Sequence, residues 1–392
     1  MTDSKAFSAS GATVRLLQAL TLVGGGTLAA GLFLAPQRTW AGLLLVSFYL
    51  VGLGLGSLLW VALHYVTGAR WSVALRRVPE AMASVLPVAA VALAVVLLCW
   101  PSLYPWSTSA FPEGYTSPMR QLWLTRPFFL LRAVVYLTLW LAFAKAIVRT
   151  SRRQDLHVDP APTRKNIGLS AAFLVVFGIT CWLASHDWIM SLEPGWASTI
   201  FGVYNFAGLF VSSLAAATLL VIWLRPRSAL QAVVTDDHLH DLGTLVFAFS
   251  SFWMYAWFCQ YMLIWYVNNP EETAYYLRRT SGTWPLLSLL CLVLIWGIPF
   301  LVLLFRRFKR NALVLSTVCV AVLAGRWLDL FLMIFPSQGE AVAIPGPIEA
   351  GLALGAAGVF LLVFFRGLGK ASLVPRHDPF CFEPHVALVD HG

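Results

Sequence analysis

Ionisable side chains interrupt long apolar stretches of this sequence at a few positions. His186 and Asp187 close an apolar segment that is long enough to cross a membrane. A charged residue at such a depth in lipid costs about 2.5–3.5 kcal/mol on insertion scales. Membrane proteins that keep such residues use them in function or pair them with an opposite charge. The imidazole of His186 beside a carboxylate can pass protons near neutral pH.

The composition predicts an integral membrane protein. Of the 392 residues, 59% are hydrophobic and 11% are charged, and the mean hydropathy is +0.75, whereas a soluble domain has about 25% charged residues. The first apolar run lacks a cleavage pattern and is expected to be a retained anchor. We predict an all-α membrane protein with ten transmembrane helices, over residues 16–34, 39–66, 82–100, 128–148, 167–190, 199–224, 243–268, 284–306, 312–335 and 348–366.

The basic residues predict the orientation. Of the 27 Lys and Arg residues, 19 lie in the terminal segments and the loops on the same side, 5 lie in the opposite loops, and the remaining 3 are inside spans. This positive-inside bias predicts that both termini are cytoplasmic. The net charge of +9 is therefore attributed to topology and to contact with anionic membrane lipids, and no nucleic-acid partner is expected.

The cysteine and histidine residues predict that the chain itself holds no metal and no cofactor. None of the six cysteines forms a C-x-x-C pair, which excludes an iron–sulfur cluster or a c-type haem attachment within the chain. His64 and His186 fall at opposite ends of the predicted bundle. They cannot ligate one haem iron or one zinc ion.

Depth along the helices suggests one polar cluster in the periplasmic half of the predicted bundle. Counted at about 1.5 Å per residue, Arg326 and Asp329 lie in the same half of the bundle as His186 and Asp187, and Arg132 enters from that side. Arg326 and Asp329 share a helix face. We expect these five residues to meet and to conduct protons. The alternative is that Arg132 with Asp187, or Arg326 with Asp329, are structural ion pairs.

Further polar residues could complete a proton path to the cytoplasm. The candidates are His64, Lys145, Asp241, Tyr204 and Tyr255. The alternative for His64 and Lys145 is that they extend to the cytoplasmic interface. Hydroxyl residues in spans also often bond to their own helix.

Three stretches carry a resemblance to a known family. They are HDWIMSLEPGWASTIFG (186–202), HDLGTLVFAFSSFWMYAWFCQYMLIWYVNNPEETAYYLRR (240–279) and AGRWLDLFLMIFP (324–336). Nearly the whole chain resembles the F subunit of bacterial alternative complex III, a quinol:electron-acceptor oxidoreductase. That subunit is related to the NrfD/polysulfide reductase membrane anchors. The matched polar positions are His186, Asp187, Glu193, Asp241, Tyr255, Gln260, Tyr261, Arg326 and Asp329.

The resemblance implies an architecture, a location and partners. The single membrane domain would contain four-helix bundles at 39–190 and 199–335, flanking helices at 16–34 and 348–366, and an extended cytoplasmic tail at 367–392. The chain would lie in the bacterial cytoplasmic membrane beside the quinol-binding C subunit. An iron–sulfur B subunit and c-type haem subunits would carry electrons from menaquinone or another quinone. Family members often have Asp-Pro-His where this chain has Glu193-Pro194-Gly195, so any role of that histidine does not apply here.

Two alternative functions remain open at this point. A quinone ring could bind between Trp188, Trp196 and Tyr204, with His186 or Asp187 accepting its proton, because such a site needs an aromatic slot and an acid–base group. The chain could instead be a standalone secondary transporter. Transporters favour helices broken at the midplane, whereas Pro194-Gly195 falls between two spans.

Overall fold

The computed structural model describes residues 7–99, 103–107, 118–156, 158–339, 344–375 and 377–379. It contains ten helical segments long and apolar enough to cross a membrane, which confirms the predicted all-α fold of ten spans. Eight of these segments are built on α1 (Gly11–Leu34), α2 (Pro36–Thr67), α6 (Arg126–Arg153), α7 (Ala161–Trp188), α8 (Phe201–Leu224), α9 (Asp236–Val267), α14 (Ala312–Ile334) and α15 (Pro347–Leu368). The other two are composite.

The third span joins α3 (Arg77–Met82) to α4 (Leu86–Cys99), and the eighth joins α11 (Trp284–Leu292), a π-helical turn at Val293–Gly297 and α12 (Ile298–Leu303). Short helices outside the spans are α5 (Pro118–Trp123), α10 (Pro270–Arg279) and α13 (Arg306–Arg310).

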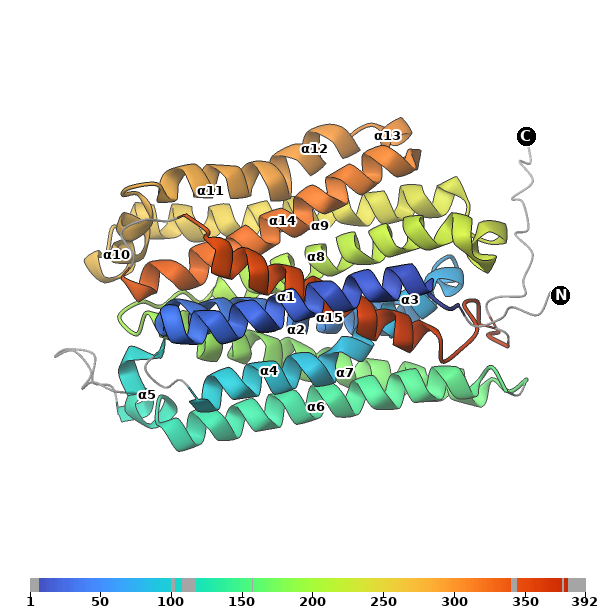
Figure 1. Cartoon of the computed structure of the whole chain (residues 1–392), viewed down its shortest axis with the longest axis horizontal. Helices are drawn as coiled ribbons and strands as arrows, with labels where there is room; N and C mark the ends of the chain where they lie inside the picture. The colour runs from blue at the N-terminus through green and yellow to red at the C-terminus, as the bar shows by residue number, and fades with distance from the viewer. Residues whose placement is uncertain are drawn as a thin grey trace.

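The long helices run side by side (Figure 1). The start of α1 and the end of α15 lie at one end of the bundle, together with α3 and α13. We call this the terminal end. The opposite end carries α5 and α10, and we call it the distal end. The prediction that the terminal end faces the cytoplasm rests on the distribution of basic residues.

Two central helices, α2 and α8, organise the bundle. Both are buried along most of their length and pack against each other. Around α2 lie α4 and α7, with α6 packed on α7. Around α8 lie α9 and α14. The pair α1 and α15 flanks this core, and α15 contacts α2 and α3. Because lipid offers no hydrogen bonds, helices that satisfy their own backbone are the form such apolar segments must take.

The π-helical turn in the eighth span has a local cause. Pro299 has no backbone N–H, so the carbonyl of Ile295 loses the donor that an α-helix would supply. The hydroxyl of Ser250 on α9 donates a hydrogen bond to that carbonyl instead. Gly325 on α14 faces the same turn, because a Cβ there would lie 2.6 Å from Cγ1 of Ile295.

The third span begins earlier than predicted. Residues 67–81 are a loop in the sequence-based prediction, but the helical segment starts at Val73 and α3 contains Arg77 and Glu80. Both side chains are buried. Hydropathy alone misses this turn of helix because it contains charged residues. The fold can bury them because partners elsewhere in the chain neutralise their charges.

The contact between α1 and α15 yields a stability prediction. A Cβ at Gly355 would lie 2.5 Å from Cα of Gly24, so the two backbones touch. We expect Gly24→Ala to lower the free energy of unfolding by about 1–3 kcal/mol through overpacking. At the neighbouring Gly25, a Cβ would have no atom within 4 Å, so Gly25→Ala is the matched control. Thermal unfolding in one detergent checks both variants, and equal midpoints would contradict the assignment.

Candidate functional site

Asp187 accepts hydrogen bonds from three kinds of side chain. The indole N–H of Trp123 donates to Oδ1 at 2.8 Å. Arg132 donates through Nε to Oδ2 and through Nη2 to Oδ1, each at 2.9 Å. The hydroxyl of Tyr136 donates to Oδ2 at 3.2 Å. Arg132 and Tyr136 are four residues apart on α6, so both face α7. We call these four residues the Asp187 cluster.

Asp329 on α14 has the same kinds of partner. Arg326, one turn earlier, donates from Nη1 at 2.5 Å. Tyr204 on α8 donates its hydroxyl proton, and the indole N–H of Trp253 on α9 donates at 3.2 Å. Arg326 also donates to the Oδ1 of Asn205. We call this the Asp329 cluster, and every member is buried.

A glycine on α8 leaves room for the guanidinium of Arg326. Gly208 lies on the face of α8 that Arg326 covers, because a Cβ there would lie 2.5 Å from Nη1. A larger residue at 208 would push the arginine away from Asp329. The glycine therefore positions an ion pair that belongs to another helix.

Four of the five residues expected to meet in one cluster form two separate ion pairs, and His186 belongs to neither. Arg132 pairs with Asp187 and Arg326 pairs with Asp329. The ring of Phe201 lies 6.1 Å from that of His186 and 6.3 Å from that of Tyr204. The expectation of one shared cluster is thus corrected, because the two aspartates belong to different halves of the bundle.

His186 is oriented by backbone carbonyls. Its Nδ1 lies 2.7 Å from the carbonyl oxygen of Trp182, and its Nε2 lies 3.2 Å from that of Ser198. A neutral imidazole carries one N–H and can donate to only one of these acceptors, whereas an imidazolium donates to both. His186 and Asp187 both line a cavity of about 370 Å³, and Trp123, Met190 and Trp196 line it as well.

A second cavity, of about 290 Å³, reaches the Asp329 cluster. Its inner end is formed by Tyr204, Trp253 and Asp329. Two of its lining residues, Tyr261 on α9 and Leu289 on α11, are 37% and 58% exposed. The mouth therefore lies on the outer surface of the bundle between these helices. The remaining walls include Trp257, Gln260, Tyr275, Tyr276, Arg279 and Leu292.

Tyr276 belongs to the wall that α10 contributes to this cavity. The side-chain amide of Gln260 donates to its hydroxyl at 3.2 Å. Burial raises the pKa of Tyr276 to about 12, so its hydroxyl keeps its proton at neutral pH. It can therefore act as a donor toward a group inside the cavity.

The three residues predicted to form a quinone slot, Trp188, Trp196 and Tyr204, have different surroundings. Trp188 is fully buried among the rings of Phe48 and Trp140. Trp196 stacks on Tyr275 with ring centroids 3.9 Å apart. Tyr204 lines the cavity at Asp329, which Trp188 and Trp196 do not reach.

Four other path candidates lie apart from these clusters. Tyr255 is 62% exposed on the outside of α9, and Lys145 is exposed on α6. Asp241 is half-exposed beside His240, with Nδ1 and Oδ1 3.3 Å apart. His64 is half-buried, and its Nδ1 lies 2.7 Å from the carbonyl oxygen of Trp60. Tyr255 therefore lies on the surface of the bundle and not beside Asp329.

Glu193 and Arg279 tie together the three stretches that carry the family resemblance. Arg279 donates to Oε1 of Glu193 at 2.8 Å and to the carbonyl oxygen of Leu332 at 2.9 Å. Its guanidinium also lies 3.4 Å from the centre of the Tyr275 ring. Glu193 receives a second bond, of 3.2 Å, from Arg278. These bonds hold the segments together at the distal end, where Arg279 lines the same cavity as Asp329.

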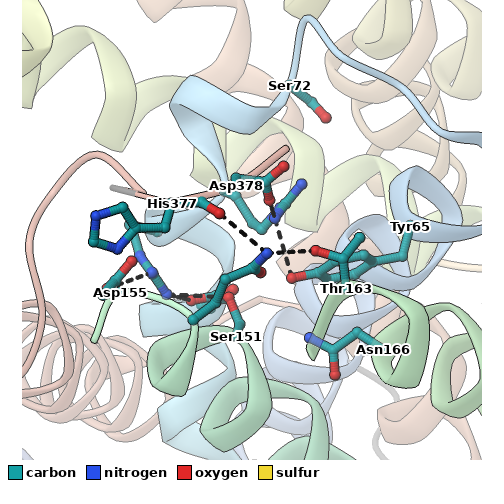
Figure 2. Close-up of polar contacts among 12 residues, drawn as sticks. Tyr65, Ser72, Ser151, Asp155, Thr163, Asn166, His377 and Asp378 are labelled. Atoms are coloured by element: carbon teal, nitrogen blue, oxygen red, sulfur yellow. Dashed lines mark hydrogen bonds and ion pairs between the residues drawn. The ribbon is translucent and has the colours of Figure 1, made fainter. Parts of the chain in front are cut away.

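A buried polar cluster at the terminal end is absent from the sequence-based prediction (Figure 2). Arg77 donates to Glu80 and to Asp155 at 2.6 Å each, and Arg76 donates to Asp378. The signal in the sequence is the spacing of Arg77 and Glu80 directly before an apolar run, which is that of a helical ion pair. Nothing in the sequence points to the distant partners Asp155 and Asp378.

Compared with protein-family models and with curated proteins, the chain matches none. The described residues also contain no group of three or more His, Cys, Asp or Glu side chains that could hold a metal ion.

The burial of Asp329 gives a second stability prediction. Asp329→Asn leaves Arg326 without its counter-charge in the interior, and we expect a loss of about 3–5 kcal/mol. Asp236 pairs with Arg225 at 2.7 Å, but its side chain is 62% exposed. Asp236→Asn is therefore the control and should change stability by about 1 kcal/mol or less. Denaturation of the purified protein measures both, and similar losses would contradict the assigned role of burial.

Proposed function

We propose that the chain is a cofactor-free membrane subunit of a quinol-oxidising complex in the bacterial cytoplasmic membrane, and that it conducts protons. One observation supports this most directly. Two buried aspartates have the same set of donors, namely an arginine, a tyrosine and a tryptophan, and each lines a cavity in the distal half of the bundle. A carboxylate that is buried yet reachable from a cavity can bind and release a proton.

The donor sets suggest how a proton would move. Tyr136 and Tyr204 each carry a hydroxyl that donates to the carboxylate. A hydroxyl can accept a proton on one lone pair while passing its own to the carboxylate. The arginine places a positive charge beside the carboxylate. His186 would exchange protons with the cavity that it shares with Asp187.

The partners follow from the family resemblance. The terminal end would face the cytoplasm, and the chain would lie beside the quinol-binding C subunit. Iron–sulfur and c-type haem subunits would pass electrons from menaquinone or another quinone to a periplasmic carrier. The chain would contribute scaffold and proton path, and none of the redox centres.

Proton stoichiometry tests the conduction. In the intact complex, we expect Asp187→Asn and Asp329→Asn to reduce the protons released per electron while quinol oxidation continues. Tyr204→Phe should act in the same direction without breaking the ion pair, because it removes only the hydroxyl. Glu271→Gln, at an exposed position of α10, is the control. Full quinol turnover with full stoichiometry in all three variants would refute the conduction.

Purification tests the assignment to a complex. An affinity-tagged copy of the chain, extracted in a mild detergent from its native membranes, should bring iron–sulfur and haem-bearing polypeptides with it. A standalone transporter would be recovered alone. Haem absorbance and peptide mass spectrometry distinguish the two results.

A quinone site is a second candidate function, supported by the cavity at Asp329. Its aromatic walls suit a flat ring, Tyr204 and Asp329 stand at the inner end, and its mouth opens toward the lipid-facing surface between α9 and α11. Electron transfer would still require a redox centre in a partner subunit. The site differs in place from the slot predicted around Trp188.

The two locations make opposite predictions for binding of a quinone analogue. We expect Trp257→Ala to weaken binding by roughly ten-fold, which corresponds to about 1.4 kcal/mol, because Trp257 forms one wall of the cavity. Trp188→Phe should leave the affinity unchanged. Titration of the analogue into the purified protein measures both. A loss with Trp188→Phe alone would favour the slot around Trp188.

A further inference from the structure

The polar cluster at the terminal end is assembled from five segments of the chain. Arg76, Arg77 and Glu80 come from the start of the third span, and Tyr65 comes from the end of α2. The hydroxyl of Ser151 on α6 accepts a bond of 3.1 Å from Arg77. Further members are Gln154, Asp155, Thr163 and Asn166 from the end of α6 and the start of α7, and His377 and Asp378 from the C-terminal tail (Figure 2).

The tail covers this cluster through specific contacts. Arg76 donates to the carboxylate of Asp378, and both side chains are buried. The amide of Gln154 donates to the backbone carbonyl of His377 at 3.3 Å. Leu373 is 2% exposed and joins the hydrophobic core. The tail is therefore docked through an apolar anchor and an ion pair.

The charges show that the tail supplies a missing counter-charge. Arg76, Arg77 and Arg152 face only two carboxylates from the rest of the described chain, Glu80 and Asp155. Asp378 is the third carboxylate. A guanidinium buried without a counter-charge is unfavourable, so removal of the tail favours entry of water to Arg76.

Several buried polar atoms of the cluster have no hydrogen-bond partner among the described residues. They are Nε of Arg77, Oε1 of Glu80 and Oδ1 of Asn166. Arg77, Glu80 and Asn166 are 3%, 1% and 0% exposed. A buried water typically makes about three hydrogen bonds to such groups. Donor and acceptor atoms are both present, so the chemistry of the site suits water.

The geometry points to a water-binding polar cluster at the terminal end of the first half of the bundle. Residues 371–375 and 377–379 of the tail are its lid, and the Arg76–Asp378 pair holds this lid in place. Docking of these tail residues separates the cluster from bulk solvent. Release of Asp378 exposes the cluster to solvent and leaves Arg76 to be hydrated. The inference needs neither a quinone nor a partner subunit, and its test measures access to the cluster rather than turnover.

Access is measured with a thiol probe. Ser151 is 2% exposed and lies inside the cluster, and Ser151→Cys is close in size to the native residue. A membrane-impermeant maleimide is applied to the full chain in lipid nanodiscs, and modification at position 151 is followed by peptide mass spectrometry. We expect slow labelling with the tail intact. Ending the chain at Pro375, or introducing Asp378→Asn, should accelerate labelling by roughly ten-fold or more, because local opening controls access.

Adding the tail back as a peptide distinguishes a lid that covers the cluster from a general loosening of the fold. A synthetic peptide of residues 374–392, added to the shortened chain, should restore slow labelling, whereas the same peptide carrying Asp378→Asn should not. Asp236→Asn removes an exposed pair from the same end and should leave the rate unchanged. Equal rates with and without the tail would overturn the proposal. So would fast labelling that the unmodified peptide fails to slow, or acceleration by Asp236→Asn.

Discussion

The neutralisation of buried charge is the constraint on which this structure depends. A protein that crosses lipid cannot leave a guanidinium or a carboxylate without an opposite charge in its interior. At the distal end the buried pairs are Arg132 with Asp187, Arg326 with Asp329, and Arg279 with Glu193. The first and third of these join elements that are far apart in the sequence. Together the pairs set how the helices meet at the distal end, and Arg77 with Glu80 does the same at the terminal end.

The span pattern could be predicted from the sequence because hydrocarbon imposes it locally. A run of apolar residues of sufficient length becomes a helix whatever its neighbours are, so the ten spans follow from hydropathy. The start of the third span could not be predicted in that way. Arg77 and Glu80 are polar by any scale, and only the positions of Asp155 and Ser151 make their burial favourable.

The candidate site was predictable to the extent that helix geometry is local. Arg326 and Asp329 are three residues apart, and their pairing follows from the helical repeat. The pairing of Arg132 with Asp187 is one of two interpretations that the sequence allows. The two residues lie on different helices, and the sequence of neither helix determines the distance between them. The contributions of Trp123 and Trp253 could not be predicted, since a tryptophan in an apolar run gives no sign that its N–H faces a carboxylate. The surroundings of the residues in the predicted quinone slot could not be predicted for a related reason. Trp188 is close to Trp196 in sequence, but the two rings pack against different partners.

The ion pairs also limit the proton conduction that we propose. If Asp329 takes up a proton, the charge of Arg326 remains, and that side chain is 2% exposed. The protonated state is therefore costly unless a negative charge arrives or the arginine changes partner. Asn205 already accepts a bond from Arg326, but an amide supplies no charge. The cavity at Asp329 could remove this cost, because a group bound there could deliver the proton together with the compensating change in charge. Proton uptake at this aspartate would then be tied to what occupies the cavity, which is the coupling that a redox-linked proton path requires.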